Sequence, residues 1–372
     1  MIGKKDIARE KPQGWEDVWG VAKEALMIGK KDKYQVNKEK AYEHQQAALK
    51  FIKKKKIHEA INELKEATRC DPFCPNHFNN LGYYYWKIGQ VKEAAVYGRR
   101  CFELIDGVIS TYRDLVCSKF VRDAIADVAD DEVISGLENR THEEIRADAD
   151  EEIKDYADML AGAGSIMDIV GDPDAKRCLE TSIYLNPNCW IARYNLGLYY
   201  LKRDLTEDAI SEYSAAYKFN KQDPGLITNL SYLYNSVGMI EESISLIDAY
   251  KKDHPLTNDM LYILADNYYG LKHDSEVLTI LKKIVNNEPQ SAFAHAAIAD
   301  MYAHLGWKSE AYKEINIAKS LNKEEKEQGA ENIIKKVLKW LDDPDDDNNT
   351  MLFLFLLMLM KKKMNDKKNL KR

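Results

Sequence analysis

The sequence predicts an all-α protein, a right-handed superhelical solenoid of about seven helix-turn-helix repeats with an acidic helical insertion after the second repeat. Three observations predict this fold class. Small residues and aromatic residues return every 34 residues, apolar residues within each unit follow the 3.6-residue helical spacing, and several units end near a proline. Because a single hairpin leaves an apolar face in water, such units must stack on one another.

The first unit, which begins at Ala41, shows the pattern most completely. Ala48, Ala60 and Ala67 stand at positions 8, 20 and 27, and Pro72 stands at position 32. Small residues at positions 8 and 20 allow the two helices of a hairpin to approach closely, and a proline at position 32 cannot continue the second helix. The units begin at residues 41, 75, 156, 190, 224, 258 and 292, so the spacing is 34 except for one step of 81.

This skeleton of three small residues and a proline resembles the tetratricopeptide repeat family over residues 41–323, apart from the insertion. Some positions depart from the family pattern. The second unit has Gly98, Cys101 and Asp106 where an aromatic residue, alanine and proline are usual, and the fifth has Ser231 and Ser243 at two small positions. The resemblance implies a scaffold without catalytic activity that binds other proteins.

The predicted domain organisation follows from these repeats. It comprises an N-terminal extension with a capping helix (1–40), repeats 1–2 (41–108), the acidic helical insertion (109–155), repeats 3–7 (156–323), a C-terminal capping helix (324–341), and an acidic linker with a short apolar and basic tail that we expect to be disordered (342–372). The insertion has fourteen acidic and six basic residues, and Thr141 with Glu144 forms a capping box that predicts the start of a helix within it. It is interpreted as an extra helical hairpin or as lengthened flanking helices, and the alternative is a degenerate eighth repeat.

The overall charge makes nucleic acid an unexpected partner. Lys and Arg number 54 against 61 Asp and Glu, a net charge of -7. The first residues are charged and contain no apolar run, so we expect a cytoplasmic protein with reduced cysteines. The apolar run at 351–360 is too short to span a bilayer, which needs about 20 residues. Membrane association through this tail remains an alternative.

The sequence offers little catalytic chemistry. The run Gly162–Gly164 resembles the start of a phosphate loop, but it falls within a predicted first helix, where small residues favour close packing. Cys70, Cys74 and His77 could supply three metal ligands, but a fourth is missing nearby and the prolines already account for the turn. We therefore predict no catalytic residue, no resident metal and no cofactor, and the protein is not expected to be an enzyme.

The inner surface of the stack is the predicted binding site. In this repeat register, positions 2, 5, 6, 9, 12 and 13 of each first helix face the concave groove. Position 6 is asparagine in three units, and an amide side chain can both donate to and accept from a peptide backbone. This row is similar to the asparagine ladder of peptide-binding tetratricopeptide proteins, although the same amides could instead bind neighbouring helices. The predicted groove residues are Asn76, Asn80, Tyr83, Trp86, Lys87, Tyr194, Asn195, Lys202, Asn229, Tyr232, Asn235, Tyr262, Tyr269 and Phe293.

The sequence predicts a scaffold or adaptor that holds an extended peptide segment of a partner protein in the concave groove. Two other functions remain open. One is a membrane-peripheral assembly factor tethered by the C-terminal apolar-basic tail, and the other is a regulatory subunit that acts through the acidic insertion.

Overall fold

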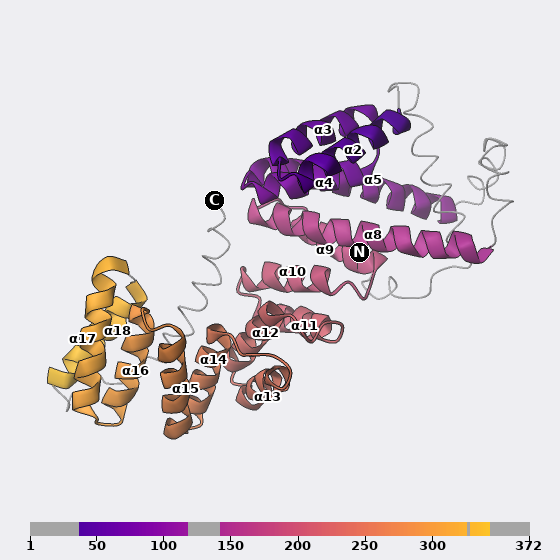
Figure 1. The fold of residues 1–372 in the computed structure, drawn as a ribbon. Coiled ribbons are helices and arrows are strands. Elements are labelled where there is room, and N and C mark those ends of the chain that lie inside the picture. The colour runs from indigo at the N-terminus through magenta and orange to yellow at the C-terminus, as the bar shows by residue number, and fades with distance from the viewer. Residues whose placement is uncertain (1–36, 118–141, 326–327, 343–372) are drawn as a thin grey trace. The chain divides into compact units, whose positions relative to one another are not determined.

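The computed structural model describes residues 37–117, 142–325 and 328–342, and these residues form fifteen α-helices (Figure 1). They fall into two compact units divided between Tyr199 and Tyr200. No β-strand occurs in the described ranges. The predicted all-α class is therefore confirmed, and each unit is described by itself below.

The N-terminal unit is built of helix pairs that follow the predicted repeats. The pairs α2/α3, α4/α5 and α8/α9 each pack together, and α5 also packs against α8. The helices are α2 (Lys38–Lys53), α3 (Ile57–Cys70), α4 (Pro75–Lys87), α5 (Val91–Cys117), α8 (His142–Ile169), α9 (Ala175–Leu185) and α10 (Trp190–Leu201), the last of which crosses the division between the units.

The C-terminal unit continues with the same pairing. The pairs α12/α13, α14/α15 and α16/α17 pack together, and α18 packs against both α16 and α17. The helices are α11 (Thr206–Tyr217), α12 (Pro224–Ser236), α13 (Ile240–Lys251), α14 (Asn258–Gly270), α15 (Asp274–Asn287), α16 (Ala292–His304), α17 (Lys308–Glu325) and α18 (Gln328–Asp342). Helix α18 lies where the sequence predicts a capping helix, and its buried side chains include Ile333, Ile334 and Val337.

A left-handed residue at position 15 ends the first helix in six of the seven units. These residues are Lys55, Gly89, Asp204, Gly238, Lys272 and Gly306, with φ between 57° and 83°. In the second unit, Gly89 N donates to Trp86 O and Gln90 N donates to Tyr85 O, which is the bonding of a Schellman cap. The other five units repeat these two bonds, so the turn within each hairpin has the same geometry.

A histidine–glutamate pair joins the two helices of the first and the last repeat. Glu63 Oε2 accepts from His44 Nδ1 at 2.7 Å, and Glu314 Oε2 accepts from His295 Nδ1 at 2.6 Å. Both pairs connect positions 4 and 23 of their units. Equivalent bonds at the two ends of the repeat series support the predicted register from Ala41 to the unit that begins at Ala292.

The second and third repeats pack together although the insertion separates them in the sequence. Phe102 and Ile105 of α5 share a buried cluster with Leu160 of α8. Arg99 Nε donates to Asp172 at 2.9 Å, and Arg99 Nη1 donates to Asp174 at 3.0 Å. The stack therefore continues from α5 to α8.

The helices that flank the insertion extend into it. Helix α5 reaches Cys117, and α8 begins at His142, directly after the predicted capping residue Thr141. The remainder of the insertion, residues 118–141, lies outside the described residues, as do the predicted N-terminal capping helix and the C-terminal tail. The predictions for those segments stay predictions.

The third repeat departs from the others at its internal turn. Its left-handed residue, Gly171, stands at position 16, and its second helix begins at Ala175, position 20, whereas six repeats start that helix at position 17. The longer turn contains the two aspartates that pair with Arg99. In the same repeat, a Cβ added at Gly164 would lie 2.7 Å from Leu179, so this glycine of the run that resembles a phosphate loop serves close helix packing, whereas a Cβ added at Gly162 would meet nothing within 4 Å.

Candidate peptide-binding surface

Helix α4 carries the most exposed group of predicted groove residues. Tyr83 and Trp86 are 45% and 37% exposed, and Asn76 and Lys87 are also exposed. Asn80 is half-buried. Residues 76, 80, 83 and 87 are spaced three or four apart, which places them on one face of the helix. The sequence-predicted residues of this repeat therefore form one accessible stripe, referred to below as the α4 stripe, with Trp86 beside it.

The aromatic residues of this surface contact one another and a lysine. The ring centroids of Tyr83 and Trp86 are 6.2 Å apart, and Tyr84 meets Tyr83 edge-on at 5.0 Å. Lys87 Nζ lies 5.6 Å from the Tyr83 ring centroid, within cation–π range. Exposed rings held in such contacts lose little conformational freedom when they bind a partner, and this is a property of interface anchors.

In two repeats, the asparagine of the predicted ladder donates a hydrogen bond to another group of the protein itself. Asn195 Nδ2 donates to the carbonyl of Ala161 at 3.0 Å, a bond that spans one 34-residue unit from position 6 to position 6. Asn229 is buried, and its Nδ2 donates to Tyr213 Oη at 3.3 Å. Both amide nitrogens thus have an intramolecular partner, and peptide binding by these two residues stays a prediction.

The remaining predicted residues of the C-terminal unit lie deeper than those of α4. Tyr232 and Tyr262 are buried, and Tyr262 packs edge-on against half-buried Phe293 at 5.4 Å. Half-buried Tyr269 packs against His304 at 5.6 Å. These rings contribute to the packing of α12, α14 and α16. Two further predicted residues, Tyr194 and Lys202, are half-buried on α10 and in the turn after it.

A polar relay connects α12, α13 and α14. Asn235 Nδ2 donates to Asn267 Oδ1 at 2.6 Å, and Asn267 Nδ2 donates to Ser243 Oγ at 2.8 Å. Ser243 Oγ in turn donates to the carbonyl of Ser231 at 2.9 Å. The hydroxyl of Ser243, one of the two serines that depart from the family pattern, therefore has a structural reason, whereas Ser231 takes part only through its backbone carbonyl and its buried hydroxyl makes no hydrogen bond. Sequence reasoning did not identify Asn267, although a serine at the small position 20 indicates that a polar partner is nearby.

Asp266 lies beside this relay, and the pKa of its carboxyl group is raised. Burial raises the pKa of its carboxyl group to about 7, against the effect of a hydrogen bond from Asn235 that lowers it. Its position, 9, is one that the repeat register directs to the groove. The carboxyl group is thus partly protonated near neutral pH, an outcome that depends on packing.

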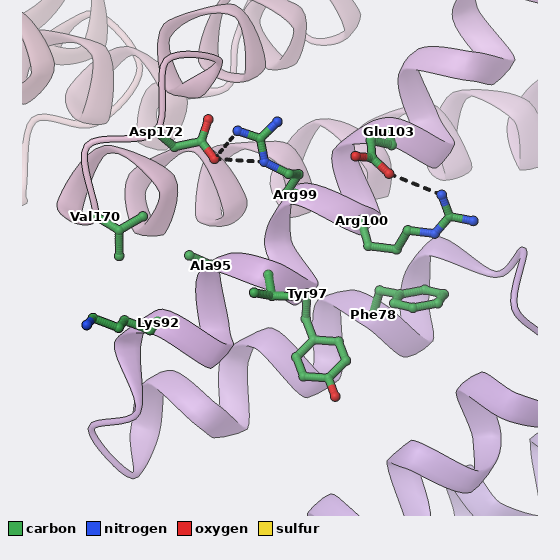
Figure 2. A pocket seen from close by; sticks show the side chains of 10 residues that line it. Phe78, Lys92, Ala95, Tyr97, Arg99, Arg100, Glu103, Val170 and Asp172 are labelled. Carbon is green, nitrogen blue, oxygen red and sulfur yellow. Dashed lines mark hydrogen bonds and ion pairs between the residues drawn. The ribbon is translucent and has the colours of Figure 1, made fainter.

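An open hollow of about 650 Å³ lies over α4, α5 and the turn after α8 (Figure 2). Phe78, Tyr97 and Val170 supply apolar surface to it. Arg99 points to Asp172 and Arg100 to Glu103, the latter pair at 3.1 Å (Figure 2). These charges pair with one another, so the hollow serves the joint between the second and third repeats and has no unpaired arginine to offer a ligand.

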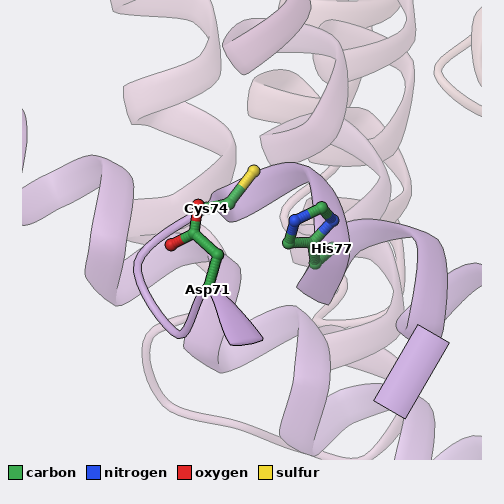
Figure 3. Close-up of side chains that lie close together, drawn as sticks. All are labelled: Asp71, Cys74 and His77. Carbon is green, nitrogen blue, oxygen red and sulfur yellow. The ribbon is translucent and has the colours of Figure 1, made fainter. Parts of the chain in front are cut away.

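One group of metal-ligating side chains comes together in the part of the chain that the structure describes. It consists of Asp71, Cys74 and His77, in the turn between α3 and α4 (Figure 3). The ligand set considered from the sequence had Cys70 in place of Asp71, and this is corrected: Cys70 is outside the group, and its carbonyl accepts from Asn37 N at 2.9 Å. Burial lowers the pKa of His77, while the nearby carboxylate of Asp71 raises it.

Comparison with known proteins gives one family match. A model described as tetratricopeptide repeat matches residues 173–225. No curated protein matches the chain. Among the described helices, none is long and apolar enough to cross a membrane.

Several solved structures are similar to the chain at low identity. A tetratricopeptide repeat protein from Parabacteroides merdae is 16% identical, with 82% of this chain and 100% of that chain covered and a TM-score of 0.47. PilF from Pseudomonas aeruginosa is 12% identical, with 68% and 93% covered and a TM-score of 0.47. YrrB, described as a tetratricopeptide protein with an unusual peptide-binding site, is 14% identical, with 58% and 97% covered and a TM-score of 0.41. With TM-scores below 0.5, these likenesses carry no argument about function.

The repeat register is supported by features of this chain's own structure and by the family match. Six hairpins share a left-handed residue at position 15, two share the histidine–glutamate pair, and the family model covers parts of the third to fifth units. On these grounds, the chain contains tetratricopeptide-like repeats, and the family model matches them over residues 173–225.

Proposed function

We propose that the protein is a scaffold that binds an extended peptide segment of a partner protein through the α4 stripe and Trp86. The repeat fold itself supports a protein-interaction role. The observation that carries the finer proposal is the exposure of Tyr83 and Trp86 beside Lys87. Large aromatic side chains are among the commonest binding hot spots, and here they are both accessible and held by neighbouring rings.

The α4 stripe also offers groups for a peptide backbone. Asn76 is exposed and Asn80 is half-buried on the same helical face as Tyr83. An amide can satisfy both the N–H and the C=O of one peptide unit, so the stripe combines apolar anchoring with polar positioning. The partner segment that fits this chemistry is extended, carries apolar side chains for the rings, and has an acidic group or a free carbonyl for Lys87.

A selected peptide provides the test. A phage-displayed library of random linear peptides is panned on the purified full chain, and the affinity of a selected peptide is measured by fluorescence polarisation. The double substitution Tyr83→Ala/Trp86→Ala should weaken binding by about 100-fold, because two hot-spot rings are lost. The melting temperature should stay unchanged, since both side chains are exposed.

The matched control is Phe219→Ala/Tyr312→Ala. These rings are 48% and 40% exposed, but neither belongs to the predicted groove positions. The control should leave the affinity within about twofold of the wild-type value, well under 1 kcal/mol. Equal losses in both double variants, or no loss in the first, would show that the α4 stripe is not the binding surface.

The alternatives from the sequence rest on segments outside the described residues. Membrane tethering would depend on the tail at 350–372, and a regulatory role would depend on the insertion, of which residues 118–141 are not described. Both stay predictions, as do the cytoplasmic location and the expectation that the protein is not an enzyme. We therefore favour the peptide-binding scaffold, whose proposed contacts lie within the described helices.

A further inference from the structure

The turn between α3 and α4 brings three different ligand types together within seven residues. The ligand atoms of Asp71, Cys74 and His77 all lie within 4.8 Å of one another. Asp71 and His77 are only 7% and 4% exposed, while Cys74 is half-buried. The group is therefore a partly enclosed cluster at the joint between the first and second repeats.

The imidazole ring of this cluster has an unpaired nitrogen. His77 Nδ1 is buried and makes no hydrogen bond. Buried polar atoms in native proteins are nearly always paired, so this nitrogen, in a ring that lies beside a thiol and a carboxyl group, calls for a physical reason. A cation bound to the ring at this turn supplies one, because the lone pair of a neutral imidazole is a metal ligand.

The backbone holds these side chains in place before any ion binds. Cys74 is the N-cap residue of α4, its side chain makes no capping hydrogen bond, and Pro75 occupies the first turn of the helix. His77 N donates to the Cys74 carbonyl at 3.2 Å, and Phe73 N donates to Asp71 Oδ1 at 3.2 Å. The ligand-bearing residues are thus fixed by the helix start and by the turn, so binding requires little ordering of the chain.

The chemistry of the set selects zinc. Thiolate, imidazole and carboxylate are the three ligand classes that proteins use for Zn²⁺, at about 2.0–2.3 Å from the ion. Ligand atoms in such a tetrahedral site lie about 3.3–3.6 Å apart, so small side-chain rotations are enough to close the cluster on an ion. Calcium and magnesium are disfavoured because they take oxygen ligands.

We propose that Asp71, Cys74 and His77 bind one zinc ion, with a water molecule as the fourth ligand, and that the ion ties the turn between the first and second repeats. The proposal does not rest on the proposed peptide binding. It differs from the set that the sequence suggested, because Asp71 replaces Cys70.

Cobalt provides the probe, since Co²⁺ occupies tetrahedral zinc sites and reports its ligands by absorption. The reduced full-length protein is titrated with Co²⁺ alone. We expect one equivalent to bind with a thiolate-to-cobalt charge-transfer band in the near ultraviolet, and Zn²⁺ to displace it. Cys74→Ser should abolish that band. Cys70→Ser, which changes a thiol only four residues away, is the matched control and should retain it.

The substitution His77→Gln distinguishes cobalt bound by the whole cluster from cobalt bound by a cysteine thiolate alone. It should weaken cobalt binding by more than about tenfold. Substitution of a residue that only hydrogen-bonds to a metal ligand already lowers metal affinity by about that factor, and His77 is proposed as a ligand itself. Far-UV circular dichroism of each variant shows whether the helices persist. If Cys74→Ser misfolds, the comparison of His77→Gln with Cys70→Ser still decides. The proposal is overturned if the wild type gives no charge-transfer band, if Cys70→Ser removes it, or if His77→Gln binds cobalt as the wild type does.

Discussion

Tyr83 on α4 and Tyr232 on α12 occupy the same position, 9, of their repeats, yet their surroundings are opposite. Tyr83 is 45% exposed and lies beside Trp86 and Lys87, whereas Tyr232 is 6% exposed. The repeat register fixes the direction in which a side chain leaves its helix. Exposure depends in addition on what the neighbouring turns and helices place over it. The two tyrosines therefore have different roles, as a candidate anchor for a partner and as part of the core.

The asparagines follow the same division. Asn80 on α4 is half-buried, while Asn229, which stands at the same position 6 on α12, is buried and bonded to Tyr213. The C-terminal unit adds the relay from Asn235 through Asn267 to Ser243, which uses amide groups to join helices. A row of asparagines at one repeat position therefore does not guarantee a row of amides available to a peptide, because some of these amides hydrogen-bond within the folded protein.

The two tyrosines should differ most in how much they contribute to the stability of the protein. Tyr232→Ala should lower the free energy of unfolding by about 3 kcal/mol, because it removes a buried aromatic ring. Tyr83→Ala should change it by no more than about 0.5 kcal/mol, as is usual for an exposed side chain. Urea unfolding of the two variants, followed by circular dichroism, gives both values. Similar destabilisation by the two substitutions would show that the difference in burial is not real.

Two glycines of α8 should respond in opposite ways to substitution by alanine. A Cβ added at Gly164 on α8 would lie 2.7 Å from Leu179, but one added at Gly162 would meet nothing within 4 Å. Gly164→Ala should therefore destabilise the protein by about 1–3 kcal/mol through overpacking.

Gly162→Ala is the matched control for that substitution. It should stabilise the protein by up to about 1 kcal/mol, because alanine is the better helix former. The thermal midpoints of the two variants should move in opposite directions. A shift in the same direction for both would contradict the close packing of α8 against α9.

The smallest effect concerns the pH dependence of the C-terminal unit. The pKa of Asp266 is raised to about 7, so between its unfolded pKa of about 4 and pH 7 the folded state holds a proton that the unfolded state has lost. Stability should therefore fall as the pH rises from about 4 to about 7, and level off above that. The fall is on the order of 1 kcal/mol, since the side chain is only partly buried.

Asp266→Asn tests this assignment. The amide cannot titrate, so the variant should lose that part of the pH dependence while remaining folded. The measurement is the urea midpoint across the pH range for both proteins. Parallel curves for the wild type and the variant would assign the slope to other groups.

Much of the fold could be predicted from the sequence because it depends on local spacing. Small residues such as Ala48 and Ala60 mark where two helices of one hairpin touch, and both are fully buried in the structure. The start of α8 at His142 follows the predicted capping residue. These features need only the helical period and the chemistry of helix ends, which can be read along the chain.

Features that depend on distant contacts could not be predicted in this way. The partner of Asn195 is a carbonyl one repeat away, and that of Asn267 is a serine on another helix. The spacing of Cys70, Cys74 and His77 suggested a ligand set, but only the folded turn shows that Asp71 faces the other two while Cys70 does not. Burial, pairing and side-chain direction in these cases are set by the three-dimensional packing of neighbouring helices.

Photo-crosslinking shows whether a peptide lies against the α4 stripe. A photoreactive amino acid is placed at Asn76, which is exposed on that stripe, or at Phe219 as a control, and each protein is irradiated with the selected peptide. We predict a covalent adduct at residue 76 and none at residue 219. Adduct formation at residue 219 alone, or at neither residue while the peptide is bound, would show that the peptide does not lie against the α4 stripe.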